Sequence, residues 1–276
     1  MILCPMIFKT KFLRSSYSEN SMKNNNILWN PKLNPKIVAV MPAYNAEKTV
    51  KKTYNDLPKD LIKEVILVDD VSHDKAIDKA KALGITVYVH SKNKGYGGNQ
   101  KTCYDQALKR KPDVVVMVHP DYQYDSKLVG VLCEPIINGR TDIMLGSRIQ
   151  TRRQILAGGM PLYKYFSNRF LTLVENLAMG LNLSEYHTGF RAYSSKVLKT
   201  VPYRKFSDDF IFDQQILISA LSFGFNISDI PIPCKYFPEA SSINFRRSAK
   251  YGVLTLWTVL TFLFNQVGLV KGNIYK

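Results

Sequence analysis

Short apolar runs alternate with stretches of helical spacing along the first half of the chain. The runs are rich in valine and isoleucine and predict four buried strands, at Ile37 to Met41, Val65 to Val68, Ile85 to Val89 and Val114 to Val118. Apolar residues at helical spacing lie between them and predict helices that begin near Glu47 and cover Lys75 to Leu83 and Asn99 to Lys109. Strands that alternate with helices predict an α/β fold with a mostly parallel sheet.

The pattern is less regular in the second half of the chain. Strands are expected at Asp142 to Leu145 and Ile227 to Ile232, and helices at Tyr163 to Met179 and Phe210 to Leu221. No internal repeat or low-complexity linker interrupts the sequence, so we expect one domain over residues 36–238. Residues 1–35 are expected to form a disordered N-terminal extension without a cleaved signal. Residues 239–276 are expected to form a basic segment and an apolar helix.

Polar side chains follow the ends of the four predicted strands. Each of them comes directly after an apolar run: Asn45, Asp69 and Asp70, Lys94 and Gly95, and His119 and Asp121. The carboxyl ends of parallel strands meet at one edge of a sheet, and ligands bind in the crevice outside that edge. The sequence therefore predicts a binding site built from these four strand ends.

The charge balance is strongly basic, with 38 lysines and arginines against 22 aspartates and glutamates and a formal charge of +16. Such an excess favours anionic partners, such as nucleic acid, acidic lipid headgroups or phosphorylated substrates. The basic residues lie in scattered pairs and no nucleic-acid-binding motif is found in the sequence, so we expect no nucleic-acid partner. The four cysteines are far apart and form no C-x-x-C pair, which argues against a zinc ribbon or a redox motif.

Four short motifs follow one another in a fixed order, namely P-A-Y-N-A-E from Pro42, V-D-D-V-S-H-D from Val68, N-K-G-Y-G from Asn93 and H-P-D-Y-Q from His119. Together they resemble glycosyltransferase family 2, the inverting enzymes with a GT-A fold. The last motif lies where the lipid-phosphate branch of the family, which includes dolichol-phosphate mannose synthase, has D-x-D followed by glutamine. The resemblance covers roughly Ile37 to Pro238. It implies a Rossmann-like, mostly parallel sheet flanked by helices.

The resemblance also implies that the donor is a nucleotide-diphosphate sugar. Its first motif would surround the nucleobase and ribose, its second would contact the nucleoside, and the G-S-R segment that ends at Arg148 would contact a phosphate. The implied donor-binding residues are Pro42, Ala43, Tyr44, Glu47, Asp70, Lys94, Gly95 and Arg148. A surface cation is the alternative for Arg148, and Asp69 is expected either beside the donor or as the residue that orients its loop.

The cofactor implied by the resemblance is a divalent ion, Mg²⁺ or Mn²⁺, that Asp121 and Gln123 would hold against the diphosphate. Such an ion neutralises the negative charge that builds on the leaving group. This sequence departs from the family at the first acidic position of D-x-D, which is His119. The His119 imidazole is expected either as a further metal ligand or as a hydrogen-bonded neighbour of the ligands.

The acceptor side of the site is expected around two later segments. Thr188 to Arg191 resembles the S-G-F-[RK] segment that borders donor and acceptor, with Gly189 allowing a tight approach and Arg191 offering charge to a phosphate. An exposed arginine after a turn is the alternative. A hydroxyl acceptor needs a general base, for which Asp209 is the first choice and Asp213 the second. A phosphate acceptor is already ionised at neutral pH and needs none. Asp209 is also placed to cap a following helix.

The segment from Tyr251 to Val270 contains no charged residue and is long enough to cross a bilayer. Its polar residues partly align on one face, which suits a helix that lies in the membrane interface. A basic cluster immediately before it, Arg246, Arg247 and Lys250, favours an anionic membrane. We expect the protein at the cytoplasmic face of a membrane, bound peripherally or by a single C-terminal anchor. A terminal helix packed on the domain is the alternative.

Two acceptors are open from the sequence. The leading hypothesis is transfer of the sugar to a polyprenyl phosphate, dolichyl or undecaprenyl. The alternative keeps the fold and uses a hydroxyl of a saccharide or lipid-linked sugar in glycan synthesis. A non-catalytic or nucleic-acid-binding protein would explain the charge of +16 but not the four ordered motifs.

Overall fold

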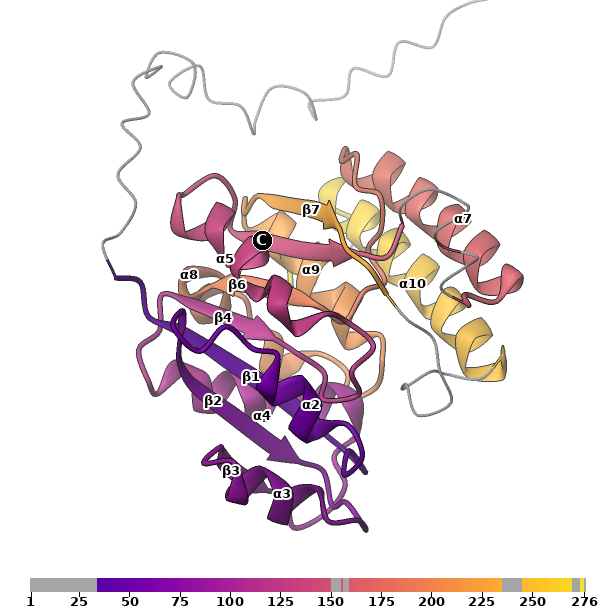
Figure 1. The fold of residues 1–276 in the computed structure, drawn as a ribbon. Coiled ribbons are helices and arrows are strands. Elements are labelled where there is room, and N and C mark those ends of the chain that lie inside the picture. The colour runs from indigo at the N-terminus through magenta and orange to yellow at the C-terminus, as the bar shows by residue number, and fades with distance from the viewer. Residues whose placement is uncertain (1–33, 150–154, 156–158, 235–244, 270–273, 276) are drawn as a thin grey trace, which may run out of the picture. The chain divides into compact units, whose positions relative to one another are not determined.

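The computed structural model describes residues 34–149, 155, 159–234, 245–269 and 274–275. All of them belong to one unit, from Lys32 to Lys276. Within this unit a 7-stranded sheet has the strand order β3-β2-β1-β4-β6-β5-β7 (Figure 1). The predicted extension over residues 1–35 lies almost wholly outside the described residues, as does the segment 235–244 before the C-terminal helix. The division at residue 239 stays a prediction.

The strands agree with the predicted apolar runs in all but one case. Their bounds are β1 Ile37–Ala43, β2 Ile62–Asp69, β3 Thr86–Val89, β4 Val114–Met117, β5 Ile143–Ser147, β6 Arg191–Ser194 and β7 Ile227–Pro231. Strand β6 pairs antiparallel with both β4 and β5, whereas the other pairs are parallel. The expected α/β fold with a mostly parallel sheet is confirmed. Strand β6 was not predicted because it is short and begins with an arginine, so no apolar run marks it.

Helices cover both faces of the sheet. Their bounds are α2 Val50–Asn55, α3 Ala76–Ala82, α4 Gly95–Leu108, α5 Val129–Ile137, α7 Leu162–Met179, α8 Ser195–Thr200, α9 Phe212–Ser222 and α10 Phe245–Gln266. Helix α4 begins at Gly95, four residues before the predicted start at Asn99, and α5 and α8 were not predicted. Glycine has a low helix propensity, so the glycine-rich first turn of α4 does not read as a helix from sequence.

Two apolar cores lie on opposite faces of the sheet, and β1 contributes alternate residues to each. Val38 and Val40 pack with α4, α8 and α9, whereas Ile37, Ala39 and Met41 pack with α2, α3 and α5. Because side chains of a strand alternate between faces, a strand covered on both sides is apolar at every position. This burial explains the uninterrupted run that predicts β1.

Seven strand ends meet at one edge of the sheet. Six parallel strands, β3, β2, β1, β4, β5 and β7, end there, and β6 starts there because its Arg191 pairs with Met117 at the end of β4. The loops that follow β1, β2, β3, β4 and β5, and the loop that precedes β6, therefore gather at this edge. They carry the motif residues that the sequence singled out.

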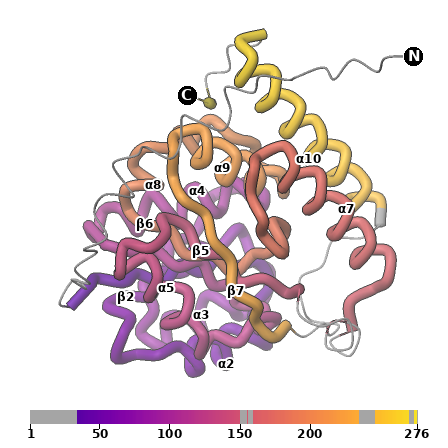
Figure 2. The backbone as a smooth tube through the Cα atoms, turned by 90° about the horizontal axis from the view of Figure 1, so that it is seen from above, coloured from indigo at the N-terminus to yellow at the C-terminus, as the bar shows by residue number. Residues whose placement is uncertain are grey.

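The C-terminal helix α10 lies beside α7 and packs on α7 and α9 (Figures 1 and 2). Val259 and Phe262 of α10 are buried in this contact. In the described part of the chain no helix combines the length and the apolar character that crossing a membrane requires. A membrane-spanning helix was one of the alternatives for the segment 251–270, and the described residues of that segment do not form one.

Candidate functional site

The loops after β1 and β2 are bound to each other by the polar residues of the first two motifs. The backbone N–H of Asn45 donates to Ser72 Oγ at 2.8 Å, and the backbone N–H of His73 donates to Asn45 Oδ1 at 2.9 Å. The Glu47 carboxylate accepts from the backbone N–H of Lys75 at 3.2 Å, and this bond lowers the pKa of Glu47. Tyr44, next to Pro42 and the buried Ala43, is 54% exposed. The loops thus present an aromatic face to solvent on a fixed backbone.

Both aspartates at the end of β2 are occupied by backbone donors. The Asp69 carboxylate accepts from the N–H of Ser72 at 2.8 Å, so it orients the following loop. The buried Asp70 carboxylate accepts from the N–H groups of Lys94 at 2.8 Å and Gly95 at 3.0 Å, and it also contacts His90 Nδ1 at 2.7 Å. Asp70 therefore ties the end of β2 to the start of α4. Its direct contact with a nucleoside stays a prediction.

The glycines at the start of α4 admit the backbone of a distant segment. A Cβ atom on Gly97 would lie 2.5 Å from the carbonyl oxygen of Ser207, and the N–H of Gly97 donates to the carbonyl of Asp208 at 2.7 Å. Gly95 has a φ of +79°, a conformation that glycine adopts without steric cost. The N-K-G-Y-G motif thus brings Lys94 at the α4 start together with the segment before α9.

The segment after β4 is a tight turn that fixes Asp121 and Gln123. Tyr122 has a φ of +59°, which is unfavourable for a residue with a side chain, and its hydroxyl donates to Asp56 at 2.5 Å. That hydrogen bond raises the pKa of Tyr122 to about 12. The Asp121 carboxylate accepts from the N–H of Gln123 at 3.0 Å, and both side chains are buried. The hydrogen bond from the Tyr122 hydroxyl to Asp56 anchors this strained turn.

The side chains of this turn fit a divalent ion that is held partly by the protein and partly by a diphosphate. The turn offers one carboxylate from Asp121, one amide oxygen from Gln123 and one imidazole from His119 two residues before Asp121. Among the described residues no three histidine, cysteine, aspartate or glutamate side chains form a cluster that could hold a metal. A complete protein cage is not needed, because Mg²⁺ and Mn²⁺ in such sites take their remaining ligands from phosphate and water.

His119 lies between an aromatic ring and a glycine. Its ring stacks on that of Tyr96 with centroids 5.6 Å apart and planes inclined by 8°. A Cβ atom on Gly189 would lie 2.8 Å from the imidazole, so the glycine of the T-G-F-R segment makes room for His119. Burial lowers the pKa of His119, although the carboxylates of Asp121 and Asp213 act in the opposite direction. The sequence did not single out Tyr96, because nothing in one sequence pairs it with His119.

Arg191 and Asp213 form a buried ion pair behind His119. The guanidinium of Arg191 lies 3.3 Å from Asp213 Oδ2, and its remaining N–H groups donate to backbone carbonyls. The Asp213 carboxylate accepts from the Tyr96 hydroxyl at 2.8 Å and from Gln100 Nε2 at 3.0 Å. Arg191 is only 1% exposed and Asp213 only 7%. Both predicted residues thus belong to a satisfied interior network.

Arg148, at the end of β5, is held by a buried glutamate that the sequence did not reveal. Its backbone N–H donates to Glu185 Oε2 at 2.6 Å, and its Nε donates to Glu185 Oε1 at 2.8 Å. Burial raises the pKa of Glu185, but the charge and hydrogen bonds of Arg148 outweigh it and the net pKa is lowered. The Arg148 side chain is 15% exposed, and its hydrogen bonds to Glu185 fix its orientation at the edge of the candidate site.

Asp209 occupies a different environment from Asp213. Its side chain is 48% exposed and lies 3.0 Å from Lys250 Nζ at the start of α10. Partial burial raises the pKa of Asp209. The N–H of Phe210 and the Lys250 ammonium lower it by more, so the net pKa is below the ordinary value. A lowered pKa makes this carboxylate a weaker base.

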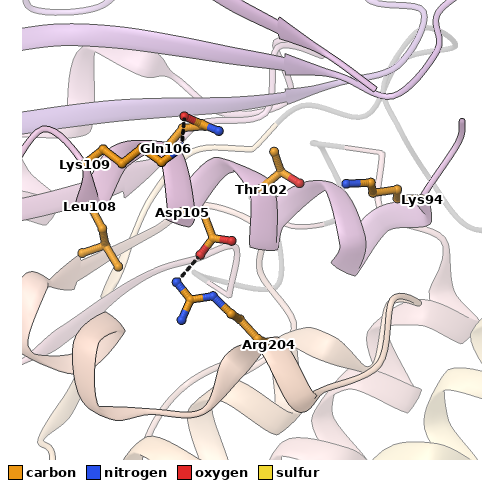
Figure 3. Close-up of a pocket in the computed structure, with 7 residues that line it drawn as sticks. All are labelled: Lys94, Thr102, Asp105, Gln106, Leu108, Lys109 and Arg204. Atoms are coloured by element: carbon orange, nitrogen blue, oxygen red, sulfur yellow. Dashed lines mark hydrogen bonds and ion pairs between the residues drawn. The ribbon is translucent and has the colours of Figure 1, made fainter. Parts of the chain in front are cut away.

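A separate pocket of about 570 Å³ lies along α4 and is lined by charged and polar side chains (Figure 3). Its walls include Thr102 and Asp105, and Asp105 pairs with Arg204 at 2.6 Å. It shares only Lys94 with the strand edge among the residues predicted to bind the donor. The candidate functional site is at the strand edge, because the four motifs and the ion pairs of Arg148 with Glu185 and of Arg191 with Asp213 gather there.

Comparison with known proteins identifies this arrangement. The model of the family described as "Glycosyl transferase family 2" matches residues 38–201. The chain belongs to glycosyl transferase family 2. A UDP-N-acetylglucosamine–dolichyl-phosphate N-acetylglucosaminyltransferase of Methanococcus voltae is 28% identical over 72% of this chain and 86% of that protein. An undecaprenyl-phosphate mannosyltransferase of Micrococcus luteus is 24% identical over 71% of this chain and 82% of that protein.

Solved structures confirm the GT-A type fold of this glycosyltransferase. Glucosyl-3-phosphoglycerate synthase from Mycobacterium tuberculosis, in complex with phosphoglyceric acid, matches with a TM-score of 0.65 at 17% identity, over 86% of this chain and 82% of that one. The same synthase with Mn²⁺, UDP-glucose and phosphoglyceric acid also has a TM-score of 0.65. Family membership and fold together make the chain a nucleotide-sugar-dependent glycosyltransferase.

Proposed function

We propose that this glycosyltransferase moves a sugar, with inversion at the anomeric carbon, from a nucleoside-diphosphate sugar to a polyprenyl phosphate such as dolichyl or undecaprenyl phosphate. The observation that carries the proposal is an exposed apolar face on α7 and α10, the two helices that adjoin the acceptor side of the site. The two relatives named for transfer to dolichyl and undecaprenyl phosphate support the same acceptor class.

The donor would bind along the strand edge. The exposed Tyr44 and the loop tied by Glu47 would contact the nucleobase and ribose, and the α4 start at Lys94 and Gly95, held by Asp70, would contribute to the same donor site. Arg148 would contact a donor phosphate from the end of β5. Asp121 and Gln123, with His119, would hold Mg²⁺ or Mn²⁺, which would neutralise the leaving diphosphate.

The carboxylates around the site favour an acceptor that needs no general base. Asp213 is buried and engaged by Tyr96 and Arg191, and Asp209 has a lowered pKa beside Lys250. Neither carboxylate is set up to remove a proton from a hydroxyl. A phosphate monoester is ionised at neutral pH and attacks without that help. We therefore prefer the phosphate acceptor to the hydroxyl acceptor.

The apolar face on α7 and α10 suits a membrane surface, where a polyprenyl chain resides. On α7 it consists of Leu162, Tyr163, Phe166, Phe170, Leu173 and Leu177, and on α10 of Val253, Trp257, Leu260 and Phe264, all between 39% and 77% exposed. Such a large apolar surface marks an interaction site. The exposed cations Arg246, Arg247 and Lys250 begin α10 and would meet the anionic headgroups of a cytoplasmic leaflet.

Product analysis tests the proposal. The full chain is incubated with a panel of nucleotide sugars, Mn²⁺ and vesicles that contain a polyprenyl phosphate, and the products are examined by mass spectrometry after organic extraction. We expect a polyprenyl-phosphate sugar in the organic phase. A product found only in the aqueous phase would contradict a lipid acceptor.

A single substitution then distinguishes the two acceptors. Asp209→Asn should keep turnover within about threefold of wild type if the acceptor is a phosphate, whereas a hydroxyl acceptor that depends on this base should lose at least about a hundredfold. Asp213→Asn is unsuitable for this test, because it also removes the partner of the buried Arg191.

A further inference from the structure

A chain of polar contacts leads from the buried Arg191 to the imidazole of His119. Arg191 pairs with Asp213 at 3.3 Å, the Tyr96 hydroxyl lies 2.8 Å from Asp213 Oδ2, and the same hydroxyl lies 3.4 Å from His119 Nε2. All members come from different elements, namely β6, α9, α4 and the turn after β4. This series of polar contacts therefore connects the interior of the domain to the turn that carries Asp121.

The chemistry of the three groups sets the direction of these hydrogen bonds. A carboxylate paired with a guanidinium only accepts, and a tyrosine hydroxyl has one hydrogen to give. The Tyr96 hydrogen goes to Asp213, the nearer partner at 2.8 Å. The Tyr96 oxygen is then left as an acceptor toward His119, so a hydrogen bond between these two residues requires the hydrogen to be on Nε2 of the imidazole.

We propose that Tyr96, oriented by Asp213, is a positioning residue that holds His119 in the Nε2–H tautomer and thereby leaves Nδ1 as the ring nitrogen available to the divalent ion beside Asp121. The inference rests on the proposed function, since it concerns the ion that Asp121 would hold. A histidine that ligates a metal through one nitrogen characteristically donates a hydrogen bond from the other, which sets both tautomer and ring orientation.

The packing around the ring supports this role. Tyr96 stacks almost parallel to His119, and Phe210 stacks on Tyr96 with centroids 4.5 Å apart. Gly189 packs against the His119 imidazole from the loop before β6, and a Cβ atom on Gly189 would lie 2.8 Å from Nε2. Nε2 therefore faces Tyr96 and the β6 loop. Of the charges that act on the imidazole, that of Asp121 has the strongest influence.

The arrangement explains how a histidine can stand where the family motif has an acid. A carboxylate offers two equivalent oxygens and binds an ion in either orientation, whereas a neutral imidazole offers one nitrogen and only in the correct tautomer. The substitution of His119 for an acid thus requires a neighbour that selects the tautomer. Tyr96 and Asp213 supply that neighbour.

The tautomer is measured first, without metal or substrate. Two-bond ¹H–¹⁵N correlation spectra of the full chain report the tautomer of each of its four histidines, and the His119→Asn spectrum identifies the signal of His119. We expect Nε2–H for His119 in the wild type and a mixture of tautomers in Tyr96→Phe. Tyr203→Phe is the matched control, because it removes another buried tyrosine hydroxyl, bonded to Asp105, and should leave the spectrum unchanged.

Titration calorimetry of Mn²⁺ binding in the presence of UDP then shows which of the two imidazole nitrogens of His119 binds the ion. Asparagine places its oxygen near the position of Nδ1 and glutamine near that of Nε2, so His119→Asn should bind Mn²⁺ more tightly than His119→Gln. Tyr96→Phe should weaken Mn²⁺ binding by about tenfold, the usual size of such effects, and Tyr203→Phe should not.

An Nδ1–H signal for His119 in the wild type, or tighter Mn²⁺ binding by His119→Gln than by His119→Asn, would overturn the inference. The proposed function fails separately. It fails if the wild type transfers no sugar to lipid, whatever the tautomer of His119.

Discussion

Charged side chains at the strand edge are placed in pairs whose members come from distant parts of the sequence. Arg191 pairs with Asp213, and Arg148 pairs with Glu185, which is 0% exposed. A buried charge that loses its partner is costly, because it remains desolvated without compensation. These pairs therefore set the positions of the cations beside the site as well as contributing to folding.

Glu185→Gln should destabilise the fold by about 3 kcal/mol, since it leaves the mostly buried Arg148 without its carboxylate. Because the folded pKa of Glu185 is lowered, its contribution is present above the unfolded pKa and is lost as the pH falls through the folded pKa. Urea unfolding at neutral and at acidic pH measures both effects. Glu134→Gln, at an exposed position of α5, is the control and should unfold like the wild type. Equal stability of the two variants would argue against the pair.

Asp121→Asn should lower kcat by at least about a hundredfold, because the amide removes the only carboxylate of the proposed ion site. The fold should persist, since the turn at Tyr122 is anchored by Asp56 and not by Asp121 alone. Asp125→Asn, which alters a carboxylate four residues along the same loop, serves as the control. Near-normal turnover of Asp121→Asn with a nucleotide sugar would contradict the ion site.

At the scale of elements, the orientation of α10 is the main finding. Thr255 and Thr258 face the domain and are buried, whereas Val253, Trp257 and Leu260 face outward. Trp257 is 63% exposed. Val259 and Phe262 are buried on the inner side as well, so this helix is apolar on both sides, which is what a second apolar medium on its outer side would favour.

Combined Phe166→Asp and Trp257→Asp should reduce sedimentation with anionic vesicles at least about tenfold, because each removes a large apolar side chain from the proposed membrane-binding surface of α7 and α10. The thermal midpoint should change little, since both positions are more than half exposed. Val131→Asp, on α5, changes an exposed apolar residue elsewhere and should bind vesicles normally. Undiminished vesicle binding of the double variant would remove this surface from the proposal.

At the scale of the molecule, the formal charge of +16 would complement the two phosphorylated substrates and the anionic membrane of the proposed function. Electrostatic attraction of this kind is screened within about 8 Å at physiological ionic strength. Its contribution therefore depends on salt, unlike that of the apolar face.

Activity with polyprenyl phosphate in vesicles should consequently fall severalfold between low and about 0.5 M salt when the vesicles are anionic, and much less when they are neutral. Initial rates at fixed donor concentration measure this. Arg246→Gln with Arg247→Gln should reduce the difference between the two vesicle types. Identical salt profiles for both vesicle types would indicate that the basic excess serves the substrates and not the membrane.

The sequence alone determined the α/β class, most of the strands and the edge at which the candidate site lies. Strands covered on both faces must be apolar at every position, so β1, β2 and β4 are visible as runs, and parallel strands place the residues that follow them at one edge. The four motifs in their fixed order indicated the family. The H-P-D-Y-Q motif also singled out Asp121 and Gln123.

The tertiary structure decided which polar groups at that edge meet each other. Glu185 lies 37 residues from Arg148, and Asp213 lies 117 residues from Tyr96, so no local pattern joins them. It also decided that Arg191 and Asp213 are buried and that the outer face of α10 is apolar. A hydrophobic run shows that a segment avoids water, but only packing determines which of its sides finds protein and which does not.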